Sequence, residues 1–533
     1  MKRLGFHIQR LMDLLMLPFA TYSFYFISIF LLMVIPDMFF YVFEGQIPVR
    51  LFFSCMFVAY GLTLVRSILY KREILNKIYV LVTYCLVLNF FLIDFFCTIV
   101  LDCPFGQDHV AIILGTNLNE AKEFAQMLMF TPSNWLFVLC VVSLFFLCVY
   151  LDRKLNFCLR NKYLNNIIIV AVFIGAICTV KSKSSNSNIF QKAALFFKME
   201  VPKDLSLYYS HPKLTMSDSK LPKNVVIVFG ESLSKYHSSL YGYDKETNPI
   251  FTQMRDSGDL FVFSDVEASA TSTVKAFKCM MGTYSWDFGD SKDWFRCITF
   301  LEIFEQLGYR TYWFSNQNKG GANDNVVTKF AELCDEVYFS GDKYCLTDRS
   351  SLDEDVVNLF KQKVENRDGK GLFVFHLMGS HFDFKKRYPS NFSKFHAAAY
   401  NDYLSHQREN IAAYDNSVLY NDFVVTEIFK QYQDEESIAI YVPDHALDIY
   451  QTTDDYVGHA RGNNESIKYG KAIPFYIYMS KKYQEMHPEI ISKVKRNLHT
   501  HFETENLIYL LMDILGVNFE EAEDVQSKTL FLR

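Results

Sequence analysis

The sequence predicts an α-helical membrane bundle of about five spans, followed by a large external α/β domain with a mostly parallel sheet. Long apolar stretches fill the first third of the 533-residue chain, and long apolar helices cross membranes. In the remainder, apolar runs alternate with helical spacing, which is typical of a parallel sheet covered on both faces. Acidic residues follow two of these runs, where such sheets bind ligands.

Five stretches are long and apolar enough to approach or reach the roughly 20 helical residues that a bilayer requires. They lie at about residues 18–43, 48–70, 78–101, 135–151 and 167–180. The first is too long and too aromatic for a cleaved signal peptide, so we expect it to stay attached. Polar side chains inside a span are costly, so Asn89 and Asp94 are expected to face the bundle interior or a polar path.

Basic residues predict the orientation, because Lys and Arg near span ends stay on the cytoplasmic side. They precede the first span and follow the second and fourth: Lys2, Arg3, Lys71, Arg72, Lys77, Arg153, Lys154, Arg160 and Lys162. Five spans then place everything after about Lys183 outside. We predict a transmembrane domain at 1–183, a linker with an interfacial helix at 184–220 and an external catalytic domain at 221–533.

Net charge and cysteine content narrow the partners and the compartment. A net charge of -6 gives no basis for a nucleic-acid partner. Of the 12 cysteines, four follow the spans: Cys279, Cys297, Cys334 and Cys345. An oxidising compartment would allow Cys279–Cys297 and Cys334–Cys345 as the nearest-neighbour choice among three possible pairings, and four free thiols are the alternative.

Apolar, β-branched or aromatic runs mark the strands expected in the external domain: Val225–Phe229, Arg310–Phe314, Gly371–Leu377, Ile438–Val442 and Ile473–Tyr478. Glu231 follows the first run, and Asp444 and His445 follow the fourth. Ligands of open α/β sheets collect at the carboxyl ends of parallel strands. The three side chains can therefore converge on one metal ion.

Gly230-Glu231-Ser232 is one of a series of motifs that resembles the membrane-bound phosphoethanolamine transferases of the alkaline phosphatase and sulfatase superfamily. The likeness covers nearly the whole chain in order, through residues 116–121, 239–243, 246–249, 376–381, 387–389, 414–420, 443–445 and 458–459. This resemblance implies a sulfatase-like catalytic domain in the periplasm, anchored by several spans in a bacterial inner membrane.

The resemblance also suggests the nucleophile, within the segment 269–274. In one branch of the family a threonine lies six residues before a cysteine, and counting back from Cys279 gives Thr273, with Thr271 as the alternative. Ser269 and Lys278 replace a cysteine and a proline of that branch, so its local disulfide cannot form. These differences favour the branch that modifies lipopolysaccharide core sugars.

The resemblance implies a zinc site and several substrate contacts. Glu231, Asp444 and His445 would hold Zn²⁺, with Thr273 at the remaining position, where the metal promotes ionisation of the hydroxyl. The phosphate would meet His381 and His459, which can act as acid, base or hydrogen-bond donor, whereas His376 is as easily a core residue. The remaining substrate contacts would be Thr116, Glu120 and Lys319, although a solvated helix face and a Gly-rich turn explain Glu120 and Lys319 equally well.

The implied reaction moves phosphoethanolamine from phosphatidylethanolamine to lipopolysaccharide, at a core sugar or lipid A, through a phosphothreonine. A periplasmic glucan is another possible acceptor, and two inversions at phosphorus give net retention. A true sulfatase is disfavoured, because no C/S-x-P-x-R segment occurs near residues 264–290. The alternatives are a glycerolphosphate transferase of the lipoteichoic acid synthase type and a non-catalytic lipid-binding membrane protein.

Overall fold

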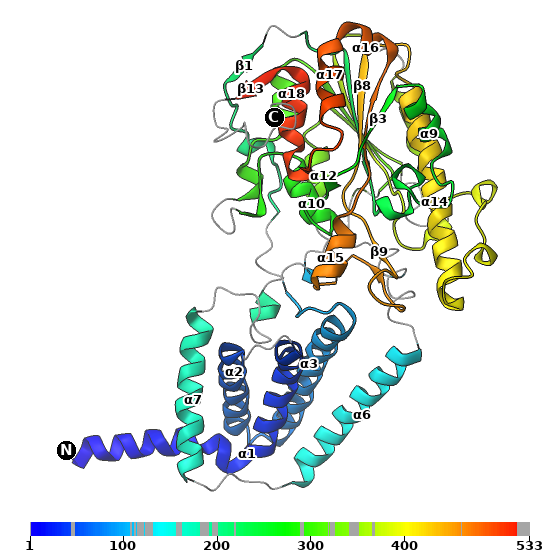
Figure 1. Ribbon diagram of the computed structural model, residues 1–533. Coiled ribbons are helices and arrows are strands. Elements are labelled where there is room, and N and C mark those ends of the chain that lie inside the picture. The colour runs from blue at the N-terminus through cyan, green and yellow to red at the C-terminus, as the bar shows by residue number, and fades with distance from the viewer. Residues whose placement is uncertain are drawn as a thin grey trace. The chain divides into compact units, whose positions relative to one another are not determined.

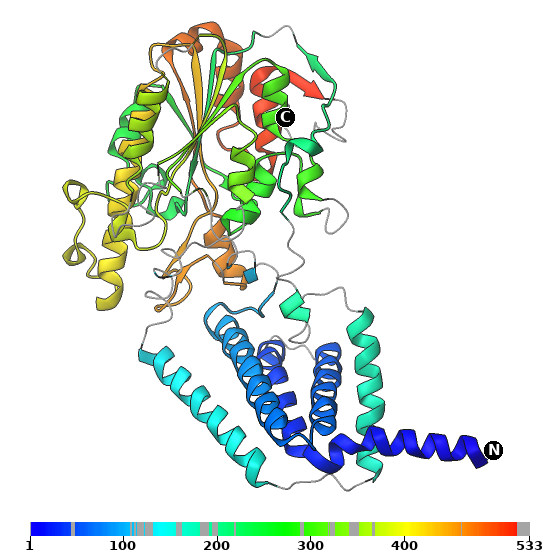
Figure 2. The same cartoon turned by 180° about the vertical axis from the view of Figure 1, so that it is seen from behind.

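The structure of the protein is a computed structural model, which describes most of the chain. The described residues are 2–43, 48–106, 109–110, 113, 122, 132–155, 162–181, 191–194, 201–217, 220–287, 293–317, 319, 326–340, 351–364, 368–459 and 461–519. The chain forms two compact units: Met1–Ile113 with Phe124–Glu200, and Leu114–Glu123 with Val201–Arg533. Figures 1 and 2 show both units from opposite sides. Thr116, Glu120 and Cys345 lie outside the described residues.

The first unit is a bundle of long helices. Their bounds are α1 (Lys2–Phe43), α2 (Val49–Ile68), α3 (Glu73–Val100), α6 (Pro132–Lys154) and α7 (Lys162–Lys181). Among the described residues, four stretches are long and apolar enough to cross a membrane: Thr21–Val42, Val49–Ile68, Glu73–Val100 and Trp135–Lys154. The fifth predicted span lies in α7, where the apolar part Tyr163–Thr179 is shorter. The predicted membrane bundle is therefore confirmed, with four stretches of full length.

A buried ion cluster joins three segments of this bundle. Lys192 Nζ lies 2.7 Å from Asp37 Oδ2 of α1 and 2.8 Å from Asp94 Oδ1 of α3, and all three side chains are buried. Asp94 therefore faces the interior, as expected. Asn89 is exposed and so does not face the interior, and the polar path stays a prediction for this residue. Its Nδ2 donates to the Cys85 carbonyl at 2.7 Å, so the helix itself satisfies part of the amide.

Replacing Lys192 by Met should destabilise the membrane unit, because two buried carboxylates then lose their cation. Removing one partner of a buried ion pair costs about 3–5 kcal/mol. Thermal unfolding of the full chain in detergent measures the change. Lys77→Met is the matched control, because Lys77 pairs with Glu73 on an exposed surface, where ion pairs contribute little to stability. Equal effects of the two substitutions would contradict the prediction.

The second unit is built on a seven-stranded sheet in the order β3-β11-β8-β2-β7-β5-β6. The strands are β2 (Asn224–Gly230), β3 (Leu260–Phe263), β5 (Arg310–Ser315), β6 (Glu336–Phe339), β7 (Gly371–His376), β8 (Ser437–Pro443) and β11 (Phe475–Met479). The central strand β2 runs parallel to β7 and β8, with Asn224 opposite Gly371 and Ser437. In the described sheet, β11 is antiparallel to both of its neighbours, β3 and β8, and so runs opposite to the other six strands. The predicted mostly parallel sheet is confirmed.

Helices cover both faces of this sheet (Figures 1 and 2). One face carries α9 (Pro249–Asp256), α13 (Glu354–Lys363) and the long α14 (Ser405–Lys430), and the other carries α10 (Thr273–Met280), α11 (Phe300–Gln306), α12 (Val326–Ala331) and α18 (Leu507–Leu515). Alternation along β2 explains this arrangement, because successive side chains point to opposite faces. Ile227 and Phe229 thus join the core formed with α10 and α18.

Further helices and short strands complete the second unit. They are β1 (Leu214–Met216), β4 (Val266–Glu267), β9 (Asp448–Ile449), β10 (Val457–Gly458), α15 (Asn464–Lys471), α16 (Lys481–Met486), α17 (Pro488–Arg496), β12 (Phe502–Glu503) and β13 (Val517–Phe519). The strands among them form three two-stranded sheets outside the main sheet: β1 with β13, β9 with β10 and β4 with β12. The antiparallel β9–β10 hairpin follows the carboxyl end of β8 after four residues.

The expected Cys279–Cys297 disulfide is wrong. Cys279 is a free thiol, fully buried in α10. Burial raises the pKa of this thiol to about 12, so it behaves as a small apolar side chain. Cys334 is also a free buried thiol, and its expected partner Cys345 lies outside the described residues.

Candidate active site

The carboxyl end of β2 positions Glu231. Every residue of β2 is buried, and a side chain at Gly230 would strike the Tyr441 hydroxyl of the neighbouring strand. On the other side, the loop after β7 approaches closely: a Cβ at Gly379 would lie 2.6 Å from the Glu231 carbonyl oxygen. Gly379 has φ +53°, which only glycine adopts without strain. One close contact with a side chain and one with the backbone therefore fix the start of the turn that carries Glu231.

The adjacent end of β8 brings Asp444 and His445 to the same place, as the sequence predicts. His445 Nε2 lies 3.3 Å from Glu231 Oε1 and 3.5 Å from Asp444 Oδ2. All three side chains are buried, and one potential ligand atom of each lies within 4.8 Å of the others. Glu231 and Asp444 are thus two acids packed together with a single imidazole.

Two features of the hydrogen bonding in this cluster are those expected of ligands to a cation. Within the described part of the chain, the buried Asp444 Oδ2 has no hydrogen-bond partner. His445 Nδ1 lies 2.9 Å from the Ala446 carbonyl, which can only accept, so the proton is on Nδ1 and the lone pair is on Nε2. Carboxylate oxygens and a neutral imidazole are ordinary Zn²⁺ ligands, so the donor set fits this metal.

The electrostatics of the cluster also favour a cation. Burial, and then the charge of Asp444, raises the pKa of Glu231 to about 8, and burial raises the pKa of Asp444 to about 6. Burial lowers the pKa of His445, so its ring stays neutral. A divalent ion would offset the cost of holding both acids ionised in a buried site.

We expect the stability of the metal-free protein to fall as the pH rises from about 4.5 to 8. Glu231 keeps its proton in the folded state up to about pH 8, whereas the unfolded chain releases it near 4.5. The folded state therefore binds more protons in this window, and the free energy of unfolding decreases with pH. Zinc should stabilise the protein increasingly over the same window, because binding displaces protons. Thermal unfolding with chelator and with zinc measures both trends, and a flat chelator curve would contradict the prediction.

Thr273 completes the cluster from α10. It is the first residue of that helix, and its Oγ1 lies 3.3 Å from Glu231 Oε2 and 3.4 Å from His445 Nε2. The methyl carbon of Thr271, by contrast, lies close to Gly470 of α15. Of the two candidate nucleophiles, the structure therefore brings Thr273 to the acids and the imidazole.

His459 lies beside the cluster at the end of the β9–β10 hairpin. Its ring centroid is 4.2 Å from that of His445, and its Nδ1 donates to the Thr271 carbonyl at 2.6 Å. The Nε2 lone pair is thus available to accept a proton. Burial, and then the nearby His445 and His381, lowers the pKa of His459 well below its usual value.

The loop after β7 carries His381. Burial, then Arg387 and His445, lowers its pKa to about 3. Its buried Nδ1 has no hydrogen-bond partner among the described residues, so a substrate group could complete its bonding. His376, by contrast, packs against Phe277 and Trp313 in the core. The core interpretation of His376 agrees with these contacts.

Gln317 reaches the cluster, and the sequence interpretation missed it. Its Nε2 lies 3.4 Å from Glu231 Oε2, directly after the carboxyl end of β5. The signal was present, because the predicted strand ends three residues earlier, at Phe314, at the same sheet edge. Lys319 was predicted to touch phosphate, but its exposed Nζ lies 3.9 Å from Glu332 Oε1. Its role toward substrate stays a prediction.

The fold and this cluster define the class of protein. The chain belongs to the sulfatase family, whose family model matches residues 223–517. This match confirms the predicted superfamily. The chain is also similar to the phosphoethanolamine transferase EptC of Escherichia coli K12, with 24% identity over 460 residues that cover 79% of this chain and 77% of that one.

Two solved structures share the fold. The integral membrane lipooligosaccharide phosphoethanolamine transferase A (EptA) of Neisseria meningitidis has a TM-score of 0.62 and 17% identity, and the alignment covers 96% of this chain and 98% of that one. The periplasmic domain of EptC from E. coli, in complex with Zn, has a TM-score of 0.55 and 24% identity over 60% of this chain and 89% of that one. The first likeness extends over the helical bundle and the sheet domain together.

Proposed function

We propose that the protein transfers phosphoethanolamine from phosphatidylethanolamine to lipopolysaccharide, at a core sugar or at lipid A. The convergence of the Thr273 hydroxyl with Glu231, Asp444 and His445 carries this proposal. The names of the similar proteins support the transferred group, because EptC and EptA are both called phosphoethanolamine transferases. The name of EptA also supports a lipooligosaccharide-type acceptor.

The location follows from the same argument. A lipid donor suits a chain with several membrane-length helices, and a lipopolysaccharide acceptor suits a catalytic domain in the periplasm. We therefore propose a multi-pass protein of a bacterial inner membrane, with a membrane domain at 1–183, a linker at 184–220 and the catalytic domain at 221–533. The Zn complex of the EptC domain supports zinc as the metal.

The residues of the cluster have separate roles in the proposed reaction. Glu231, Asp444, His445 and Thr273 would hold Zn²⁺, which would supply a Lewis acid that favours the ionised hydroxyl. Thr273 Oγ1 attacks the phosphorus of the donor, its bond to phosphorus forms, and the bond to the diacylglycerol oxygen breaks. Thr273 Oγ1 loses its proton in the attack, and the departing oxygen takes up one proton and leaves as diacylglycerol, so the protons balance.

The second step regenerates the threonine. An acceptor hydroxyl or phosphate oxygen attacks the phosphothreonine, the bond between Thr273 Oγ1 and phosphorus breaks, and Thr273 Oγ1 takes up one proton, which balances the proton that a hydroxyl acceptor loses. His459 is the proposed base for a hydroxyl acceptor, because its Nε2 carries a lone pair and its ring lies next to that of His445. His381 is proposed to bind a phosphate oxygen. Thr116 and Glu120 are proposed to bind the donor headgroup, and Lys319 to bind phosphate.

Mass spectrometry of the envelope lipopolysaccharide, from cells with and without the protein, tests this function. The proposal requires a species heavier by one phosphoethanolamine group in cells that contain the protein. An added glycerolphosphate mass would instead support the lipoteichoic acid synthase type of reaction. Unchanged masses, together with no diacylglycerol release from phosphatidylethanolamine by the purified protein, would support the non-catalytic alternative.

A further inference from the structure

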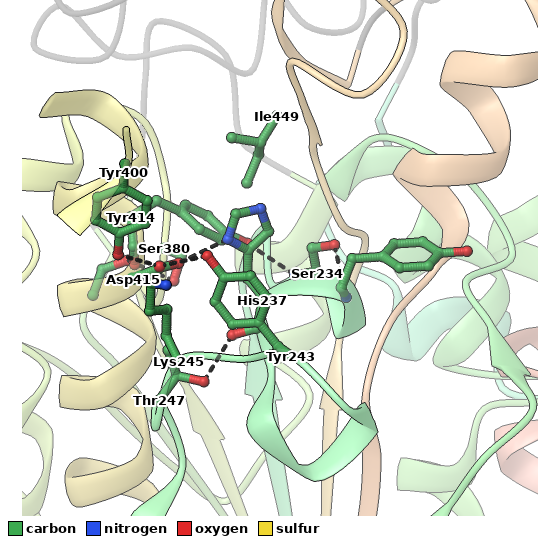
Figure 3. A network of polar contacts seen from close by, with 12 residues as sticks. Ser234, His237, Tyr243, Lys245, Thr247, Ser380, Tyr400, Tyr414, Asp415 and Ile449 are labelled. Carbon is green, nitrogen blue, oxygen red and sulfur yellow. Dashed lines mark hydrogen bonds and ion pairs between the residues drawn. The ribbon is translucent and has the colours of Figure 1, made fainter. Parts of the chain in front are cut away.

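Helix α14 holds the turn that carries Glu231. Tyr414, near the middle of α14, is fully buried, and its hydroxyl contacts this turn at two points. The hydroxyl donates to the Ser232 carbonyl at 2.8 Å and accepts from the Ser234 backbone N–H, also at 2.8 Å. Figure 3 shows the Tyr414 side chain directed toward the segment that contains Ser234 and His237. One hydroxyl thus satisfies a buried carbonyl and a buried N–H of the same turn.

The turn needs a hydrogen-bonding group from another part of the chain, because its backbone is strained. Ser232 has φ +58°, in the left-handed region that a non-glycine residue adopts only when the surroundings impose it. Ser232 and Ser234 are both buried. Without the Tyr414 hydroxyl, two buried backbone groups would lose their hydrogen bonds, and relaxation of Ser232 toward ordinary φ values would become favourable.

Ser232 in turn contacts both acids of the cluster. Its Oγ donates to Glu231 Oε1 at 2.8 Å, and its backbone N–H donates to Asp444 Oδ1 at 3.3 Å. A change at Ser232 would therefore turn the Glu231 carboxylate and release Asp444 at the same time. This arrangement connects the Tyr414 hydroxyl to two of the three candidate metal ligands through a single residue.

The neighbouring residue fixes Tyr414 in place. The Asp415 carboxylate is fully buried and bonds to His237 Nδ1 at 2.7 Å, to the Tyr243 hydroxyl at 2.7 Å and to the Tyr400 hydroxyl at 2.5 Å (Figure 3). The Tyr414 ring packs against His237 and Phe384, each with a centroid separation of 5.0 Å. Tyr414 is thus a rigid support, whose ring contacts do not depend on its hydroxyl.

We propose that Tyr414 is a positioning residue that sets the metal affinity of the site, by holding Ser232 in the left-handed conformation that aims Glu231 at Asp444 and His445. The inference rests on the proposed metal site. It goes beyond that site because it assigns metal affinity to a side chain that touches neither metal nor substrate.

The test is the zinc affinity of the full-length protein in detergent, measured by competition with a chelator of known affinity. Tyr414→Phe keeps the ring and removes the hydroxyl, and we expect the zinc dissociation constant to rise about 10- to 100-fold, as for other groups that orient metal ligands. Tyr483→Phe is the matched control. Tyr483 is equally buried, lies in α16, and its hydroxyl has no hydrogen-bond partner among the described residues.

A second variant separates positioning from general loss of stability. Glycine adopts positive φ without strain, so in the Ser232→Gly background the additional effect of Tyr414→Phe on zinc affinity should be clearly smaller. A merely structural role would lower the melting temperature equally in both backgrounds and leave zinc affinity unchanged. Unchanged zinc affinity in a folded Tyr414→Phe variant, or equal loss in both backgrounds, would overturn the proposal. Failure of the unmodified protein and the Tyr483→Phe control to bind zinc would instead refute the proposed metal site.

Discussion

Thr273→Ala should abolish phosphoethanolamine transfer, with a loss on the order of 10⁴-fold or more, the scale seen when a covalent nucleophile is removed. The reason is that Thr273 Oγ1 is the candidate nucleophile that lies within 3.4 Å of both Glu231 and His445. Diacylglycerol release from phosphatidylethanolamine by purified protein measures the first half-reaction directly. Trapping of a phosphorylated Thr273 peptide by mass spectrometry measures the intermediate.

The matched control is Thr271→Ala, two residues earlier in the same segment. Its methyl carbon lies close to Gly470 of α15, whereas it is the Oγ1 of Thr273 that contacts Glu231 and His445, so this variant should retain most of its activity. Thr273→Ser keeps a hydroxyl and should retain measurable transfer. An inactive Thr271→Ala variant beside an active Thr273→Ala variant would reassign the nucleophile to Thr271.

Asp444→Asn should remove bound zinc and transfer activity together. Asn keeps the size of the side chain but loses the charge of a carboxylate whose Oδ2 has no hydrogen-bond partner among the described residues. We expect zinc affinity to fall more than about 100-fold, since even groups outside the ligand set contribute 10- to 100-fold. Elemental analysis of the purified variant measures zinc content. Saturating zinc should not restore full transfer.

Asp422→Asn controls for the removal of any buried carboxylate. Asp422 is fully buried like Asp444, and burial raises its pKa to about 7. It accepts from the backbone N–H groups of Ile250 and Phe251 at the start of α9, so its loss should lower stability while zinc content stays normal. If Asp444→Asn bound zinc as tightly as this control, Asp444 could not be a ligand.

The strand patterns predicted most of the sheet because its central members are buried on both faces. Continuous apolar runs such as Val225–Phe229 and Ile438–Val442 have few other interpretations when helical segments separate them. The strands β3 and β6 were missed, since each has only four residues at or near an edge of the sheet. The antiparallel direction of β11 was also missed, because a run of apolar residues carries no sign of direction.

The residues of the candidate site likewise fall into those that the sequence could predict and those that it could not. Strand-end residues such as Glu231, Asp444 and His445 could be predicted, because the topology alone brings them to one edge. The roles of Tyr414 and Ser232 could not be predicted, although both lie in segments that carry the family resemblance, since a backbone torsion and a contact across 182 residues of sequence leave no local pattern. The expected Cys279–Cys297 bond was wrong for a related reason: proximity in sequence says nothing about the direction of a thiol inside a helix.

The register of β2 has a consequence for biosynthesis. Asn224 pairs with Gly371 and Ser437, so the middle strand of the sheet must wait until much later segments have left the ribosome before its hydrogen bonds close. Such long-range parallel pairing forms slowly, and an unpaired apolar strand is prone to associate with other chains. The nascent polypeptide should therefore depend on holding chaperones until β8 emerges, and truncation before residue 437 should yield aggregates rather than a smaller soluble domain.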